Sequence, residues 1–141
     1  MKKTLAVVLT AGVLLMAAAP LWAHHAFGAE FDANKPVKFK GTVEKMEWIN
    51  PHAWIRLDVK DEQGKVTKWM IEAAAPNALL RRGWTKNSLL AGTEIYVEGF
   101  QAIDGTNKAN GSVITLVADG KKLFVGSSAG DPGAAPGAPS K

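Results

Sequence analysis

The chain has 141 residues, enough for one modest domain with its own core. It contains no cysteine, which excludes disulfide bonds, thiolate chemistry and lipid attachment through an N-terminal cysteine. The 17 basic residues exceed the 13 acidic ones by a small margin, and Lys2 and Lys3 account for half of it. Nucleic-acid binding, which requires a clustered basic face, is therefore not expected.

Residues 1–23 have the layout of a cleavable secretion signal. Two lysines form a charged start, an apolar stretch covers residues 5–19, and the small residue Ala23 closes the segment. A retained membrane anchor is the alternative, because the apolar segment is about long enough to span a bilayer. The alanine-rich composition and the small residue before His24 favour cleavage. We therefore expect a periplasmic or secreted protein that begins at His24 and has no stable membrane insertion after cleavage.

Between residues 36 and 125, apolar and polar residues alternate with the period of β-strands. In the first strand the apolar set steps by three residues from Val43 to Met46, which indicates a β-bulge. In the second strand Leu57 is expected to face the core and Arg56 the solvent. Further strands are predicted at about residues 66–73, 93–102, 112–118 and 122–125, with turns at 61–64, 104–105 and 119–120.

One short helix is predicted over residues 76–82. Pro76 suits the first helical position, and Gly83 suits the residue after the helix end. Three strands, a helix and two or three further strands follow the order of a small OB-like Greek-key barrel of five to six strands, so the predicted fold class is mainly β. An open β-sandwich and an α+β roll are the alternatives.

The ends of the chain complete the predicted organisation. Residues 126–141 consist mainly of Gly, Ala, Ser and Pro and cannot bury enough apolar surface to offset their ordering entropy, so we expect a disordered tail. Four segments follow: a signal at residues 1–23, a histidine-containing segment at 24–35, an OB-like domain at 36–125 and the tail at 126–141.

The three histidines are the candidate metal ligands. Cleavage makes His24 the first mature residue, followed by His25, and an N-terminal histidine chelates copper(II) through its free amine and ring Nδ1. Either His25 or His52 would supply a third nitrogen, which suits the tetragonal nitrogen coordination of copper(II), and nickel and zinc accept similar ligands. Glu30 and Asp32 are further oxygen donors. The alternative is that His52 only hydrogen-bonds within its turn and that the terminal pair has no role.

The corner after the first strand is a candidate ligand or partner patch. Trp48 and Trp54 flank the polar residue Asn50 and the stiff Pro51. Trp54 lies on the outward register of its strand and would offer a stacking face. Packing is the alternative: Trp48 in the core, and Trp54 under the N-terminal segment.

A second part of this patch lies around the predicted helix. Glu72 ends a strand, Arg81 lies in the last helical turn, where a basic side chain favours the helix dipole, and Trp84 follows the helix. Glu72 is expected to pair with His52 or with an arginine at the helix end. We find no nucleophile–base–acid set and no phosphate-binding loop, so no catalytic residue is predicted.

These residues together resemble the exported bacterial domain-of-unknown-function family 6152. The resemblance covers the chain from His24 to about Val125. It implies a small exported β-barrel-like protein, and it supplies no activity, substrate or cofactor. The residues that carry it are His24-His25-Ala26-Phe27, Phe31-Asp32, Gly41-Thr42-Val43, Trp48, Asn50-Pro51-His52-Ala53-Trp54, Glu72, Pro76-Asn77, Leu79, Arg81, Gly83-Trp84, Gly92, Asp104-Gly105 and Asp119-Gly120.

The main functional hypothesis is a non-enzymatic periplasmic binding module. The segment with His24 and His25 would pack near the corner at His52 and bind a metal ion or a partner, with copper as the cofactor that these ligands suggest and the partner unknown. A copper-dependent enzyme using the terminal histidine is the second hypothesis. The third is a structural envelope-assembly protein in which the histidines are incidental.

Overall fold

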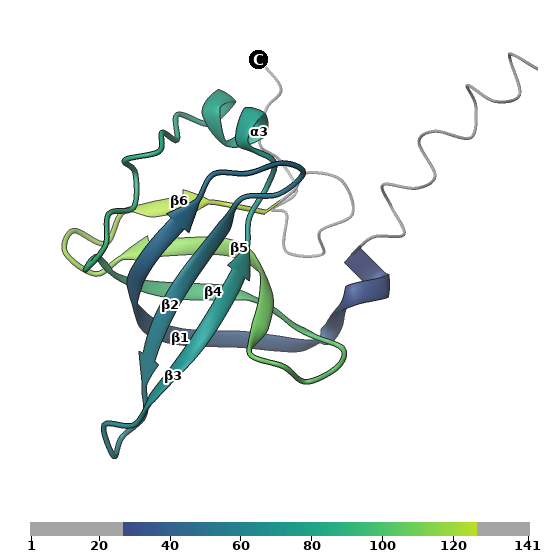
Figure 1. Ribbon diagram of the computed structural model, residues 1–141, viewed down its shortest axis with the longest axis vertical. Helices are drawn as coiled ribbons and strands as arrows, with labels where there is room; N and C mark the ends of the chain where they lie inside the picture. Colours follow the sequence, from purple (N-terminus) through teal and green to yellow (C-terminus); the bar gives the residue numbers. More distant parts are fainter. Residues whose placement is uncertain (1–26, 127–141) are drawn as a thin grey trace, which may run out of the picture.

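A computed structural model describes residues 27–126 and shows a mainly β protein, as predicted (Figure 1). The predicted signal, His24, His25 and nearly all of the predicted tail lie outside the described residues. A short helical segment at residues 27–30, which the sequence pattern did not predict, precedes the first strand. The elements that follow are β1 (Phe31–Glu47), β2 (Trp54–Lys60), β3 (Val66–Glu72), α3 (Pro76–Arg81), β4 (Glu94–Ala102), β5 (Lys108–Leu116) and β6 (Lys122–Phe124).

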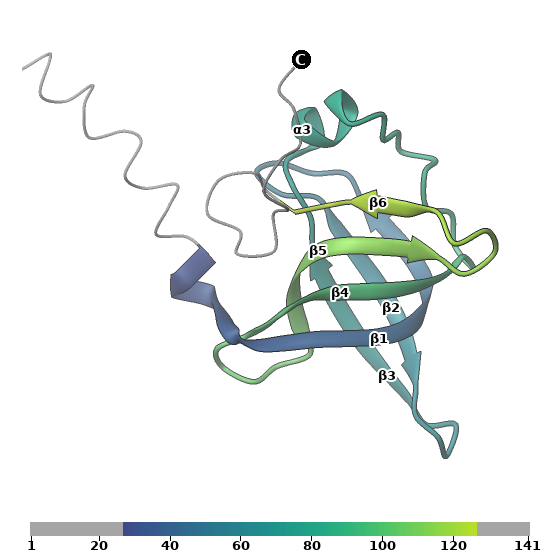
Figure 2. The same ribbon diagram turned by 180° about the vertical axis from the view of Figure 1, so that it is seen from behind.

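The six strands form one sheet in the order β3-β2-β1-β4-β5-β6. Neighbours in this order are antiparallel, and a parallel pairing between β3 and β5 joins the two sides of the sheet at three residue pairs. The chain order of three strands, a helix and three further strands is the one predicted, and the short β3–β5 pairing, the seam of the sheet, leaves the barrel-like ring not clearly closed. Viewed from behind, β1, β4 and β5 lie across β2 and β3 (Figure 2). The seam places Glu72 opposite Asn110.

The bulge predicted in β1 is present. The register between β1 and β2 shifts between Val43 and Lys45, so Val43 and Met46 both contact the core. β1 begins at Phe31, which pairs with Ala102 of β4. The strand therefore crosses the predicted boundary between residues 35 and 36.

The core lies between the two sides of the sheet. Ile55 and Leu57 are fully buried, whereas Arg56 between them is partly exposed, as the alternation predicted. Each fully buried aliphatic side chain contributes about 1.5–3 kcal/mol relative to leaving it in water. Leu79 of the helical region also belongs to this core, as does Trp84, which is only 3% exposed.

Helix α3 covers one end of this core. Pro76 occupies its start, and Gly83 after its end has a φ of 83°, a left-handed conformation that glycine adopts without strain. Within residues 27–126, no helix combines the length and the apolar character needed to cross a bilayer.

The prediction for β5 was wrong at its start, which lies at Lys108 rather than at residue 112. Asn110 and Gly111 are poor strand formers, so the local pattern gave no signal. Tertiary packing decides the conformation, because a Cβ atom on Gly111 would lie 2.7 Å from Cγ2 of Ile71. Glycine here allows β5 to approach β3 closely enough to pair.

Candidate functional site

Three polar side chains from separate elements meet at the seam of the sheet. His52 comes from the loop between β1 and β2, Glu72 from the last residue of β3, and Asn110 from β5. His52 Nδ1 lies 3.1 Å from Glu72 Oε1, and Asn110 Nδ2 donates to the same oxygen at 3.2 Å. We call these three residues the seam cluster.

Backbone hydrogen bonds hold the His52 corner against the end of β3. Ala53 donates to the carbonyl of Ala74 at 3.2 Å, and Ala73 donates to the carbonyl of Ala53 at 2.8 Å. Ala53 is fully buried. Because His52 directly precedes this anchored residue, its position relative to Glu72 is set by the main chain.

The carboxylate of Glu72 lies in a site that is poor in water. The residue is 6% exposed, and this burial raises its pKa above the ordinary value of 4.5. Attraction to His52 and the hydrogen bonds from His52 and Asn110 oppose the increase in pKa, whereas the charge of Glu30 adds to it. The pKa of Glu72 is raised because desolvation outweighs its two partners.

Asn110 was missed by the sequence analysis. It is 4% exposed, and its Oδ1 atom has no hydrogen-bond partner within the described part of the chain. A buried acceptor without a donor is uncommon and costs about 1–3 kcal/mol. No signal in the sequence could have found it, because residue 110 lies before the strand predicted at residues 112–118 and asparagine is depleted in strands.

The beginning of the described chain lies beside the seam cluster. The rings of Phe27 and Phe31 are 5.8 Å apart, and Phe27 meets Phe100 edge to face at 5.9 Å. Phe100 is the β4 partner of Asn110. Glu30, in the same segment, forms an ion pair with Lys108 of β5.

The other predicted site residues differ in their surroundings. Trp48 is partly buried against the core, and Trp54 is partly buried in β2, paired with Glu47 on one side and Glu72 on the other. Asn50, Pro51 and Arg81 are exposed, and Trp84 is a core residue away from the surface.

Two partners were predicted for Glu72, namely His52 and an arginine at the helix end, and in the structure Glu72 contacts His52. The guanidinium of Arg82, at the helix end, instead donates to the carbonyl of Gly126. Among the predicted site residues, His52 and Glu72 are therefore in direct contact.

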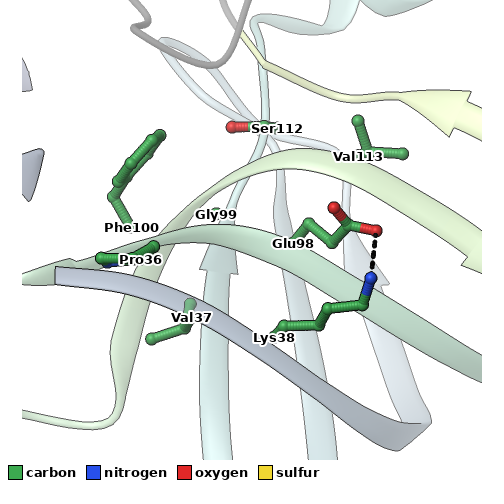
Figure 3. A pocket seen from close by; sticks show the side chains of 8 residues that line it. All are labelled: Pro36, Val37, Lys38, Glu98, Gly99, Phe100, Ser112 and Val113. Atoms are coloured by element: carbon green, nitrogen blue, oxygen red, sulfur yellow. Dashed lines mark ion pairs between the residues drawn. The ribbon is translucent and has the colours of Figure 1, made fainter.

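A shallow groove of about 430 Å³ lies on the outer side of β1, β4 and β5 (Figure 3). Pro36, Phe100 and Val113 form much of its apolar lining, and an ion pair between Lys38 and Glu98 at 3.2 Å borders it. The sequence analysis did not find this groove. Its signal was Gly99, a glycine within a strand, which marks a β-bulge between β4 and β5.

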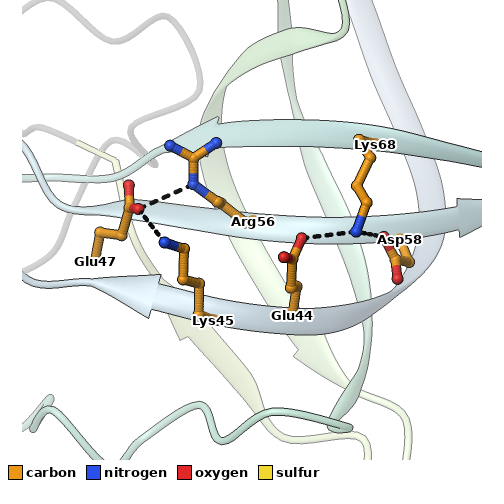
Figure 4. A network of polar contacts seen from close by, with 6 residues as sticks. All are labelled: Glu44, Lys45, Glu47, Arg56, Asp58 and Lys68. Atoms are coloured by element: carbon orange, nitrogen blue, oxygen red, sulfur yellow. Dashed lines mark hydrogen bonds and ion pairs between the residues drawn. The ribbon is translucent and has the colours of Figure 1, made fainter.

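Charged residues on the outer side of β1, β2 and β3 form a separate network (Figure 4). Glu47 Oε1 contacts Arg56 Nε at 3.0 Å and Lys45 Nζ at 2.7 Å. Lys68 Nζ bridges Glu44 and Asp58, at 2.9 Å from each. The hydrogen bond from Arg56 is the main cause of the lowered pKa of Glu47. Such solvated pairs contribute little to stability, and we assign this network to the surface of the fold rather than to the functional site.

Comparison with known proteins identifies the family. Residues 11–112 match the family of unknown function DUF6152, which is more than half of the chain. The chain belongs to this family. No curated protein and no solved structure matches it significantly.

The DUF6152 match includes the residues that meet at the seam. It extends from within the predicted signal to Ser112 in β5, so the seam cluster and both terminal histidines lie inside it. It ends before β6 and the Gly- and Pro-rich tail. The family description supplies no activity, so the functional argument depends on the chemistry of the seam cluster.

Proposed function

We propose that this DUF6152 protein is an exported, non-enzymatic binding module that holds a metal ion, with copper(II) as the favoured metal, at the His52 corner. The contact between His52 Nδ1 and the buried carboxylate of Glu72 is the observation that carries the proposal. Histidines that ligate metals usually give their second ring nitrogen to a carboxylate, a carbonyl or water. The contact between His52 and Glu72 matches this arrangement, and the His52 side chain is 36% exposed.

The remaining ligands are proposed to come from the mature N-terminus. Among residues 27–126, no three His, Cys, Asp or Glu side chains lie together in a way that would hold a metal ion. A metal at His52 therefore needs ligands from elsewhere, and the amine and imidazole of His24 have suitable chemistry.

The position of Phe27 supports this assignment. His24 precedes Phe27 by three residues, which reach at most about 10 Å when extended. Phe27 packs on Phe100, the strand partner of Asn110, so the chain at Phe27 lies near the seam cluster.

The proposed location outside the cytoplasm is supported by the layout of residues 1–23. The terminal chelate itself requires signal cleavage, because only a free amine on His24 binds copper(II). Export and metal binding are therefore linked in this proposal.

Calorimetric titration with copper(II) tests the proposed function. Protein starting at His24 is compared with protein that keeps one additional residue before it, and with His52→Ala on the authentic terminus. We expect the authentic protein to bind most tightly and both variants to bind more weakly. Equal affinity of all three proteins would contradict the proposal. Thermal unfolding of the metal-free proteins provides the control for folding.

The pH dependence of binding is a second readout. The amine and imidazoles must lose protons before they coordinate, so affinity is expected to fall below about pH 6, near the reference pKa of histidine. An affinity that is constant between pH 5 and pH 8 would exclude nitrogen ligation.

A further inference from the structure

We infer that Glu72 is a positioning residue of the metal site: its carboxylate selects the His52 tautomer that carries the proton on Nδ1 and leaves Nε2 as the ligating nitrogen. This inference rests on the proposed function, and it adds which atom of His52 binds the metal. It also assigns roles to Glu72 and Asn110.

The geometry around Nδ1 specifies the tautomer. Nδ1 of His52 is 3.1 Å from Glu72 Oε1, a distance suitable for a hydrogen bond. Glu72 Oε1 accepts the hydrogen bond from the Asn110 amide, and as an acceptor it pairs with a ring nitrogen that donates, so the ring donates through Nδ1–H. In a neutral imidazole, Nε2 then has the free electron pair that a metal requires.

The carboxylate is held in place from two sides. Glu72 pairs with Trp54 of β2 and with Asn110 of β5, so its backbone belongs to the sheet on both edges. The Asn110 amide donates to the same oxygen that faces His52. With the Glu72 side chain only 8% exposed, water has little access to compete for this contact.

The His52 side chain remains partly accessible. The His52 side chain is 36% exposed although Nδ1 faces the buried carboxylate. Part of the His52 side chain is therefore accessible from solvent while Nδ1 faces Glu72.

The free Oδ1 atom of Asn110 is a second, independent indication of a ligand. This acceptor is buried and has no partner among residues 27–126. A donor such as the terminal amine or a metal-bound water would satisfy it. The seam cluster therefore combines an imidazole held beside a carboxylate with a buried acceptor that lacks a partner among residues 27–126.

Nitrogen-detected NMR of the metal-free mature protein tests the tautomer without any metal. The expected spectrum above pH 7 shows His52 with a protonated Nδ1 and an unprotonated Nε2. A proton on Nε2, or rapid exchange between the two tautomers as in a free histidine, would overturn the inference. This result does not depend on whether copper binds.

Substitution of the carboxylate tests its effect on the metal. In Glu72→Gln the side chain keeps its size but loses its charge, and copper(II) affinity is expected to fall by about 10–100-fold, the usual cost of losing such a support. Glu94→Gln is the matched control, because Glu94 pairs with Lys40 on the surface at 2.9 Å. We expect it to bind copper(II) as the unchanged protein does. Equal affinity of Glu72→Gln and its control would overturn the positioning role.

The two proposals fail in different ways. If His52→Ala leaves copper(II) affinity unchanged, the proposed metal site at the corner is wrong. If His52→Ala weakens binding while the spectrum shows Nε2–H, the metal site stands and the inference about Glu72 is wrong.

Discussion

Replacing Gly99 with alanine should both destabilise the fold and disturb the seam cluster, because the added Cβ atom would clash with the backbone of Asn110. A Cβ atom at position 99 would lie 2.1 Å from the carbonyl oxygen of Asn110. Cβ contacts below 3.0 Å essentially do not occur, so the backbone of β4 or β5 must move by almost 1 Å. Overpacking costs about 1–3 kcal/mol, and contact with backbone rather than with a flexible side chain places Gly99→Ala at the upper end, about 3 kcal/mol.

Urea unfolding followed by tryptophan fluorescence measures this cost. With a denaturant slope of about 1.5 kcal/mol/M for a small domain, about 3 kcal/mol lowers the midpoint by about 2 M. Gly28→Ala is the control, because nothing lies within 4 Å of a Cβ atom there. We expect the control to stay within about 0.5 kcal/mol of the unchanged protein. If Gly99→Ala is as mild as Gly28→Ala, the close approach of β4 and β5 at the bulge is incorrect.

Three further predictions address the register, the buried carboxylate and the terminus. Leu57→Ala should cost about 2–5 kcal/mol in denaturant melts and Arg56→Ala less than about 1 kcal/mol; similar losses would show that the β2 register is wrong. The raised pKa of Glu72 means that the folded state binds its proton more tightly than the unfolded chain. Its contribution to stability is therefore present below pH 4.5 and is lost as the pH rises through the folded pKa. The stability of the metal-free protein relative to Glu72→Gln should accordingly fall as the pH rises above 4.5, and a difference that stays constant with pH would refute the burial effect. Mass spectrometry of the exported protein should find His24 as its first residue, and a dominant form that retains residues 1–23 would refute cleavage.

The alternation of apolar and polar residues was enough to predict most of the sheet. In β2 the period of two persists through Ile55 and Leu57, and both are fully buried. The bulge near Val43 was predictable from the same alternation, because the apolar positions there are separated by three residues instead of two. These features depend on which side of a strand meets the core, and the sequence records that directly.

The start of β5 and the short helical segment at residues 27–30 were not predictable in this way. Residues 108–111 form a strand because β3 and β4 offer partners on both sides, not because their side chains favour one. The segment at 27–30 is too short to show a helical period.

The candidate site was only partly visible in the sequence. His52 was one of the two partners expected for Glu72. The two residues are in contact because backbone hydrogen bonds of Ala53 hold the His52 corner against the end of β3. The role of Asn110 was hidden because it depends on a parallel pairing between strands 38 residues apart at this contact. Contacts that close a sheet are set by topology and leave no local pattern.

Paramagnetic broadening by copper(II) tests the proposed site most directly. Substoichiometric copper(II) is added to the protein that begins at His24, and amide signals are followed by NMR. The proposal predicts early loss of signals around His52, Glu72 and Asn110, while signals near Gly64 at the distant β2–β3 hairpin persist. Broadening that spares the seam cluster, or no broadening in the folded domain, would contradict a metal site at this corner.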